Sequence, residues 1–83
     1  MTSTETIYQS LNDIFRDILD DDSIELKPET TAQDVEGWDS LANVQIMLNV
    51  ERRFGVRLSA GKIAELRNVG DLVATISSMV QGS

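Results

Sequence analysis

The chain has 83 residues, of which 41% are hydrophobic, 25% charged and 5% aromatic, a composition typical of one small soluble domain. It carries 14 acidic and seven basic residues, so its formal charge is −7 at neutral pH, and it contains no histidine and no cysteine. The missing residue types exclude Ser–His and Cys–His nucleophile pairs, the usual zinc and iron–sulfur sites, and any disulfide framework. The negative charge argues against nucleic acid as a partner and favours basic proteins.

No apolar run approaches the roughly 18 residues that a membrane-spanning helix needs. The first residues, MTSTETIYQ, lack the basic start and the apolar stretch of a secretory signal. We therefore expect a cytoplasmic protein with no stable membrane insertion.

The first predicted helix covers about residues 4 to 20. Thr2 and Glu5 fit a capping box at its start, and Asp20-Asp21-Asp22 end it because three acids oppose the negative end of the helix dipole. The same three acids raise the alternative of a divalent-cation site, although they lack the spacing of a calcium-binding loop. Its apolar residues recur at helical spacing: Ile7, Leu11, Ile14, Phe15, Ile18 and Leu19.

A long connection, residues 21–37, follows the first helix and contains the only proline, Pro28. Loops longer than about 12–15 residues are uncommon in compact domains. Because Ile24, Leu26 and Val35 can anchor this one to a core, we expect a packed loop.

Three further helices are predicted after the loop. The second runs from Ser40 to Phe54 and ends at Gly55, with Val56 placed for the accompanying apolar contact. Ser59 is a suitable N-cap for a short third helix, residues 60–66.

Asn68, with Asp71 three residues later, resembles a capping box for the fourth helix. We found no convincing strand, so we expect an all-α fold. The expected architecture is a four-helix bundle in a single domain, residues 1–83, with three longer helices, a short third helix and a long loop between the first two. The fourth helix carries its apolar residues on one side: Val69, Leu72, Val73, Ile76 and Val80.

The second helix is apolar on two sides. At about 100° per residue, its apolar residues fall into two stripes whose directions around the helix axis differ by well over 90°. A domain of this size has little depth in which to bury a helix on all sides. We therefore expect one stripe to be exposed and to bind a partner. The alternative is that both stripes pack, one of them under the long loop. The first stripe is Ile46, Met47, Val50 and Phe54, and the second is Leu41, Val44 and Leu48.

Ser40 stands at the start of that helix, within Trp38-Asp39-Ser40-Leu41. A serine there lies beside unpaired backbone N–H groups and the positive end of the helix dipole, which suits a bound or covalently attached phosphate. The alternative is that Asp39 or Ser40 only caps the helix.

The run Gly37-Trp38-Asp39-Ser40-Leu41, followed by Val44, Leu48, Glu51 and Phe54-Gly55-Val56, resembles the acyl carrier proteins. The resemblance extends over essentially the whole chain, including Asn68-Val69-Gly70-Asp71-Leu72 at the start of the fourth helix. Asp-Ser-Leu alone is a weak motif. It becomes specific when it opens a helix that ends in Phe-Gly-Val within an acidic domain of this length.

The resemblance implies that Ser40 carries 4′-phosphopantetheine, transferred from coenzyme A by a phosphopantetheinyl transferase with magnesium. The thiol of this arm would hold acyl groups as thioesters and deliver them to acyl-loading, condensing or acyltransferase enzymes. It further implies a non-catalytic, monomeric carrier.

The same resemblance divides the second helix between two roles. Its docking surface would comprise Asp39, Leu41, Val44, Leu48 and Glu51. Trp38 is expected to pack against the loop rather than to brace the arm. The core, which in this family can open to receive an acyl chain, would include Ile46, Met47, Val50, Phe54 and Ile63.

The charge of the second helix departs from the family pattern. Typical fatty-acid carriers have a conspicuously acidic second helix, whereas residues 40–54 hold only Glu51 against Arg52 and Arg53. Residues 1–39 carry a net charge of −9 and residues 40–83 a net charge of +2. We therefore expect a dedicated fatty-acid, polyketide or other secondary pathway. The alternatives are an aminoacyl, peptidyl or D-alanyl carrier using the same serine and, less favoured, an unmodified helical interaction domain.

Overall fold

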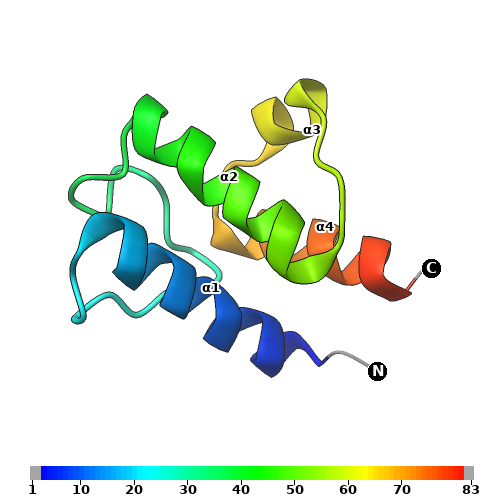
Figure 1. Ribbon diagram of the computed structural model, residues 1–83, viewed down its shortest axis with the longest axis horizontal. Coiled ribbons are helices and arrows are strands. Elements are labelled where there is room, and N and C mark those ends of the chain that lie inside the picture. The colour runs from blue at the N-terminus through cyan, green and yellow to red at the C-terminus, as the bar shows by residue number, and fades with distance from the viewer. Residues whose placement is uncertain (1–2, 82–83) are drawn as a thin grey trace.

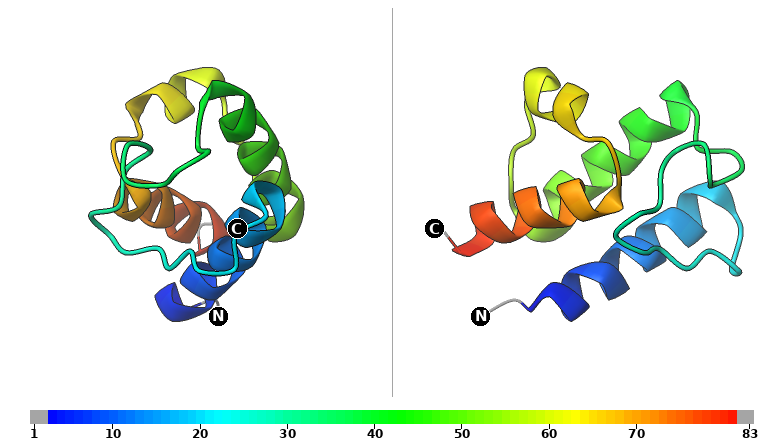
Figure 2. Two further views of the ribbon diagram at one scale, coloured as in Figure 1. Left: turned by 90° about the vertical axis from the view of Figure 1, so that its left-hand side faces the viewer. Right: turned by 180° about the vertical axis from the view of Figure 1, so that it is seen from behind.

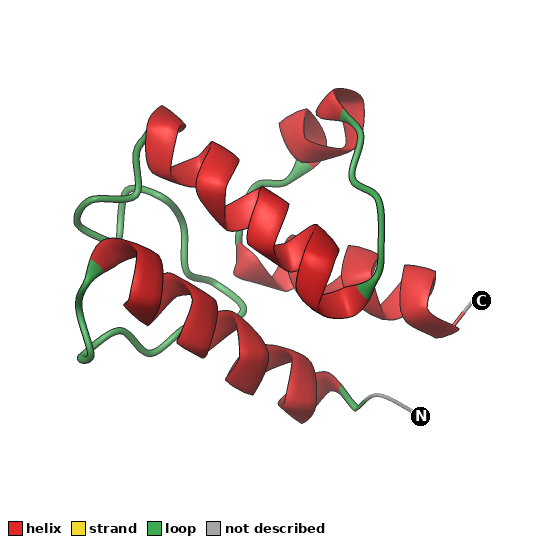
Figure 3. Ribbon diagram, viewed as in Figure 1, coloured by secondary structure: helices red, strands yellow, loops and turns green. Residues whose placement is uncertain are grey.

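The computed structural model describes residues 3–81 and is all-α over that range, with four helices and no strand (Figures 1 and 3). The helices are α1 (Thr4–Leu19), α2 (Ser40–Phe54), α3 (Ala60–Glu65) and α4 (Val69–Gln81). The predicted fold class, the short third helix and the long α1–α2 loop are confirmed. α1 and α3 each end one residue earlier than expected, at Leu19 and Glu65.

α1 packs against both α2 and α4, while α3 lies on the far side of α2 and α4 from α1 (Figures 1 and 2). The long loop closes one end of the bundle, and the start of α1 and the end of α4 lie at the other end. The start of α2 therefore lies at the loop-covered end.

The cap of α1 differs from the prediction. Ser3 is the N-cap, and its hydroxyl oxygen accepts the backbone N–H of Thr6 at 3.2 Å. The predicted capping box of Thr2 and Glu5 is therefore wrong; Thr2 itself lies outside the described residues. Serine and threonine are both favoured N-cap residues and serine is somewhat better, which agrees with Ser3 as the cap.

The end of α2 follows the prediction. Gly55 adopts φ 65°, a left-handed conformation that glycine reaches without a Cβ penalty. The backbone N–H groups of Gly55 and Val56 both donate to the carbonyl of Glu51. These bonds satisfy a carbonyl that the helix leaves unpaired and turn the chain back toward the core.

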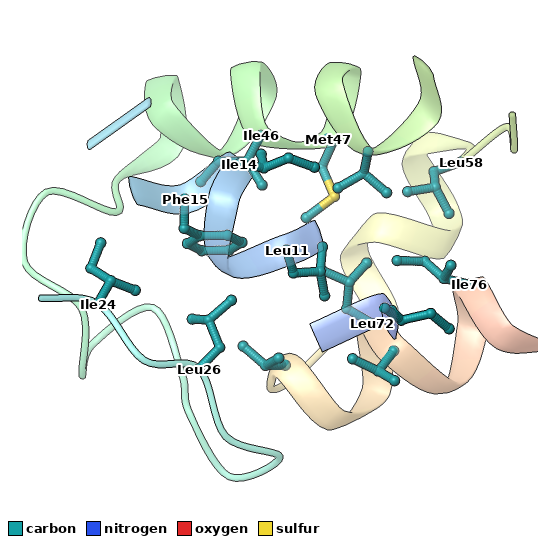
Figure 4. Packing of buried hydrophobic residues seen from close by; sticks show 14 residues of the cluster. Leu11, Ile14, Phe15, Ile24, Leu26, Ile46, Met47, Leu58, Leu72 and Ile76 are labelled. Carbon is teal, nitrogen blue, oxygen red and sulfur yellow. The ribbon is translucent and has the colours of Figure 1, made fainter. Parts of the chain in front are cut away.

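One hydrophobic core holds the helices together (Figure 4). α1, α2, α4 and the connecting loops supply its buried side chains, whereas α3 contributes none. Ile24 and Leu26 belong to it, so the prediction of a packed loop is confirmed. The buried residues are Ile7, Leu11, Ile14, Phe15, Ile24, Leu26, Ile46, Met47, Val50, Leu58, Val69, Leu72, Val73 and Ile76.

Two side chains of α1 hold the first part of the long loop. The Asn12 Oδ1 accepts the backbone N–H of Leu26 at 2.8 Å, and the Arg16 Nε donates to the carbonyl of Ile24 at 2.7 Å. These bonds fix the loop at the two residues that it buries.

The next part of the loop is bound to the start of α4. The N–H groups of Val69 and Gly70 donate to the carbonyls of Thr30 and Pro28, at 2.8 and 2.9 Å. The first N–H groups of a helix have no partner within it, so the loop supplies acceptors that α4 lacks. The loop is thereby bound to α1 at Ile24 and Leu26 and to the start of α4 at Pro28 and Thr30.

Gly70 allows this close approach, and Gly70→Ala is expected to lower the free energy of unfolding by roughly 1–3 kcal/mol. A Cβ at Gly70 would lie 2.9 Å from the Pro28 carbonyl oxygen and 3.3 Å from the Pro28 Cα, both backbone atoms. Chemical denaturation measures the effect. Gly61→Ala is the matched control, because a Cβ there meets nothing within 4 Å and alanine favours the helix. Equal stabilities of the two variants would contradict this role of Gly70.

The pKa of Asp21 is lowered from its ordinary value of 3.8, because the Ser23 hydroxyl and backbone N–H both donate to the Asp21 Oδ1. A lowered folded-state pKa contributes stability above the unfolded-state pKa, and this contribution is lost as the pH falls through the folded-state value. Ser23→Ala is expected to raise the Asp21 pKa toward its ordinary value. A carboxyl-carbon NMR titration checks this, with Ser78→Ala as the control that leaves the Asp21 pKa unchanged. If Ser23→Ala leaves the Asp21 pKa unchanged, the hydrogen bond from the Ser23 hydroxyl does not lower it.

Candidate functional site

Ser40 is the first residue of α2, and its side chain is exposed. The N-cap is Asp39, whose Oδ1 accepts the N–H of Ala42 at 2.8 Å and whose carbonyl accepts the N–H of Asn43 at 2.8 Å. Within residues 3–81, the Ser40 hydroxyl makes no hydrogen bond. Capping thus explains Asp39 and leaves the Ser40 hydroxyl available.

A cavity of about 360 Å³, open to solvent on one side, lies next to Ser40. The start of α2, α3, the residues just before α4 and part of the long loop form its walls. Its lining includes four apolar residues, Met47, Ile63, Leu66 and Leu72, and three residues with polar side chains that can donate hydrogen bonds, Asn43, Arg67 and Asn68. A group attached to Ser40 would have an apolar space within reach.

The predicted acyl-chain residues divide into two groups. Met47 and Ile63 line the cavity. Ile46 and Val50 are fully buried in the core and Phe54 is packed against it, and none of the three borders the cavity. Helical periodicity identified the inward face of α2 but not which inward residues reach the opening. It also missed Leu66 and Leu72, which come from other segments.

Trp38 packs against the core, and one of its contacts is with α1, which the sequence did not predict. Its ring meets Phe15 edge to face, with centroids 4.8 Å apart and planes at 86°. Its Nε1 donates to the Asn43 Oδ1 at 3.0 Å, and the ring also lines the cavity. Trp38 thus holds the chain in place two residues before Ser40.

The second stripe of α2 is exposed. Leu41 is 72% exposed, Val44 57% and Leu48 50%. The alternative in which the long loop covers this stripe is therefore wrong. The stripe begins directly after Ser40 and continues along α2, so a partner bound there would lie close to any group on Ser40.

The charged residues at this surface have contacts of their own. Asp39 caps α2, and the Glu51 carboxylate accepts the backbone N–H of Leu58 at 2.8 Å. The contact to Leu58 gives Glu51 a structural role that the sequence did not reveal. Arg52 and Arg57 border a shallow depression beside Leu48, so this end of α2 is basic.

Within residues 3–81, no three Asp, Glu, His or Cys side chains are grouped so that they could hold a metal ion. In the acidic run, Asp20 instead ends α1 with φ 52°, and Asp21 binds Ser23. Within the same range, no helix is long and apolar enough to cross a bilayer.

Comparison with known proteins agrees with this geometry. Residues 9–76 match the family model described as "Phosphopantetheine attachment site". The chain belongs to the acyl carrier protein family. Acyl carrier proteins are non-catalytic carriers of a phosphopantetheine arm, and the family implies a phosphopantetheinyl transferase and acyl-handling enzymes as partners.

Individual acyl carrier proteins resemble the chain over most of its length. A "Meromycolate extension acyl carrier protein" of Mycolicibacterium smegmatis is 33% identical over 75 residues, 90% of this chain and 76% of that protein. An "Acyl carrier protein" of Acidothermus cellulolyticus is 30% identical over 76 residues, 92% of this chain and 90% of that protein. The solution structure of a holo acyl carrier protein from Geobacter metallireducens superposes with a TM-score of 0.84 at 35% identity, covering 90% of this chain and 86% of that one.

Proposed function

We propose that Ser40 carries the phosphopantetheine arm and that this single-domain carrier delivers acyl groups within a dedicated fatty-acid, polyketide or other secondary pathway. One observation carries the assignment: an exposed serine with an unbonded hydroxyl begins α2 beside a cavity, while its neighbour Asp39 caps the helix. When bound, the arm supplies a flexible tether whose terminal thiol holds acyl groups as thioesters.

The start of α2 suits a phosphate on Ser40. The backbone N–H groups of Ser40 and Leu41 have no acceptor among residues 3–81, whereas Asp39 already binds the next two. Free N–H groups and the positive end of the helix dipole stabilise an anion at this position. The chain's own contribution is to fix the attachment point and to keep the tethered group near a docked partner, which raises its effective concentration.

Partners are proposed to bind the exposed stripe of Leu41, Val44 and Leu48, with Asp39 and Glu51 at its edge. Because α2 carries no net negative charge, with Glu51 against Arg52 and Arg53, binding should depend mainly on apolar contact and only weakly on salt. The relatives named for meromycolate extension favour a fatty-acyl cargo. An aminoacyl, peptidyl or D-alanyl cargo on the same serine is the alternative. The cytoplasmic location and monomeric state remain predictions.

The test is to incubate the purified protein with coenzyme A, magnesium and a broad-specificity phosphopantetheinyl transferase, and then to measure its intact mass. We expect the mass of one phosphopantetheine to be added, together with one titratable thiol. The thiol count is unambiguous because the chain has no cysteine. An unchanged mass, under conditions that modify a control carrier, would contradict the proposal.

A further inference from the structure

The polar side chains that line the cavity beside Ser40 offer mainly hydrogen-bond donors. The Asn43 Oδ1 already accepts from the Trp38 Nε1 at 3.0 Å, and the Asn68 Oδ1 accepts from the Asp71 N–H at 2.8 Å. Both partners can only donate, so each amide must turn its oxygen toward them. The amide nitrogens of Asn43 and Asn68 therefore remain available as hydrogen-bond donors.

Arg67, an exposed residue that also lines the cavity, offers a third donor. Arg67 uses its backbone N–H to bind the Asp71 carboxylate at 3.0 Å, but its guanidinium has no protein partner within residues 3–81. The Nδ2 groups of Asn43 and Asn68 have none there either. Among the residues that line the cavity, the one carboxylate is that of Asp39, which caps α2.

The apolar and the polar lining residues of the cavity therefore suit different parts of a bound chain. Met47, Ile63 and Leu72 can contact its carbon skeleton. Where it meets Asn43, Asn68 or Arg67, a saturated alkyl chain would displace water from these donors without replacing its hydrogen bonds, which is unfavourable. A chain with oxygen acceptors would replace them.

We propose that this cavity selects acyl groups bearing oxygen acceptors, such as ketones, over saturated chains of equal length. Asn43, Asn68 and Arg67 are the specificity-determining residues. The inference rests on the proposed function, because the acyl group reaches the cavity only on the Ser40 arm. It narrows the cargo from acyl groups in general to oxygenated ones.

The test compares two acylated forms of the full chain. The transferase loads Ser40 from octanoyl-coenzyme A or from 3-oxooctanoyl-coenzyme A, intact mass confirms each product, and thermal unfolding gives the Tm. These cargoes differ by one ketone oxygen, which can only accept. We expect the 3-oxooctanoyl form to melt about 4 °C above the octanoyl form, the size of effect that one net hydrogen bond has in a domain of this length.

Two variants test whether Asn43 and Arg67 cause the Tm difference between the two acylated forms. Asn43→Asp keeps an acceptor for the Trp38 Nε1 and replaces the free amide nitrogen by an oxygen. Arg67→Met keeps most of the side-chain length and removes the guanidinium. Each is expected to reduce the Tm difference by at least half, while Arg57→Met, an exposed arginine outside this cavity, leaves it unchanged. Trp38 fluorescence shows whether Asn43→Asp keeps its local fold.

The outcomes separate this inference from the proposed function. Equal Tm values for the two wild-type forms, or a difference that persists in both variants, would overturn the selectivity alone, because the added mass would still establish the carrier. If no mass is added to wild type, the proposed function fails, and the selectivity fails with it.

Discussion

Ser40→Ala is expected to abolish phosphopantetheine addition completely, so that the intact mass stays that of the unmodified chain and no thiol appears. The reason is chemical, because the alanine side chain has no oxygen to form the phosphoester. The fold should be nearly unaffected, since Ser40 is exposed and Asp39, not Ser40, caps α2. Circular dichroism and thermal unfolding check the fold beside the mass measurement.

Ser78→Ala is the matched control for this experiment. Ser78 is also an exposed serine in a helix, but it belongs to α4 and does not line the cavity. This variant should be modified as fully as wild type. Full modification of Ser40→Ala would place the arm on another residue and refute the site.

The second large effect is expected at Val50, where Val50→Asp should unfold the domain. Val50 has no exposed surface, and an unpaired charge there would cost more than about 4 kcal/mol, a large part of the stability of so small a domain. Leu48→Asp, two residues earlier and half exposed, should change the free energy of unfolding by no more than about 0.5 kcal/mol. Far-ultraviolet circular dichroism during chemical denaturation measures both.

The same pair of variants tests the docking surface. Leu48→Asp keeps the fold but places a carboxylate in the exposed stripe, so we expect slower modification by the transferase or slower acyl transfer to a partner. If Leu48→Asp unfolds the protein as severely as Val50→Asp, the two faces of α2 are assigned incorrectly. If it folds and reacts at the wild-type rate with every partner tried, the stripe is not the docking surface.

Local patterns in the sequence predicted much of this fold. The spacing of apolar residues predicted α1, α2 and α4, and the N-cap Ser59 predicted α3. The two stripes of α2 were placed correctly on its buried and exposed sides. The glycine that ends α2 was also identified, because its left-handed conformation depends on a few adjacent residues.

Contacts between distant segments were not predicted. The Glu51 carboxylate binds Leu58, Trp38 meets Phe15, and the loop carbonyls bind the start of α4. Each depends on how the helices pack, which periodicity does not describe. For the same reason, the sequence predicted the inward side of α2 but not which of its residues border the cavity. Of the four residues in the inward stripe, only Met47 does so.

The absence of fully buried side chains in α3 has a consequence for the space beside Ser40. This helix has only six residues and is held largely through Ile63 and Leu66, both only partly buried. A short segment with so few buried contacts detaches by local unfolding at a small fraction of the free energy that global unfolding requires. Its amide protons should therefore exchange with solvent faster than those of α1 or α2, and the cavity can enlarge while the core around Phe15 and Ile46 stays intact.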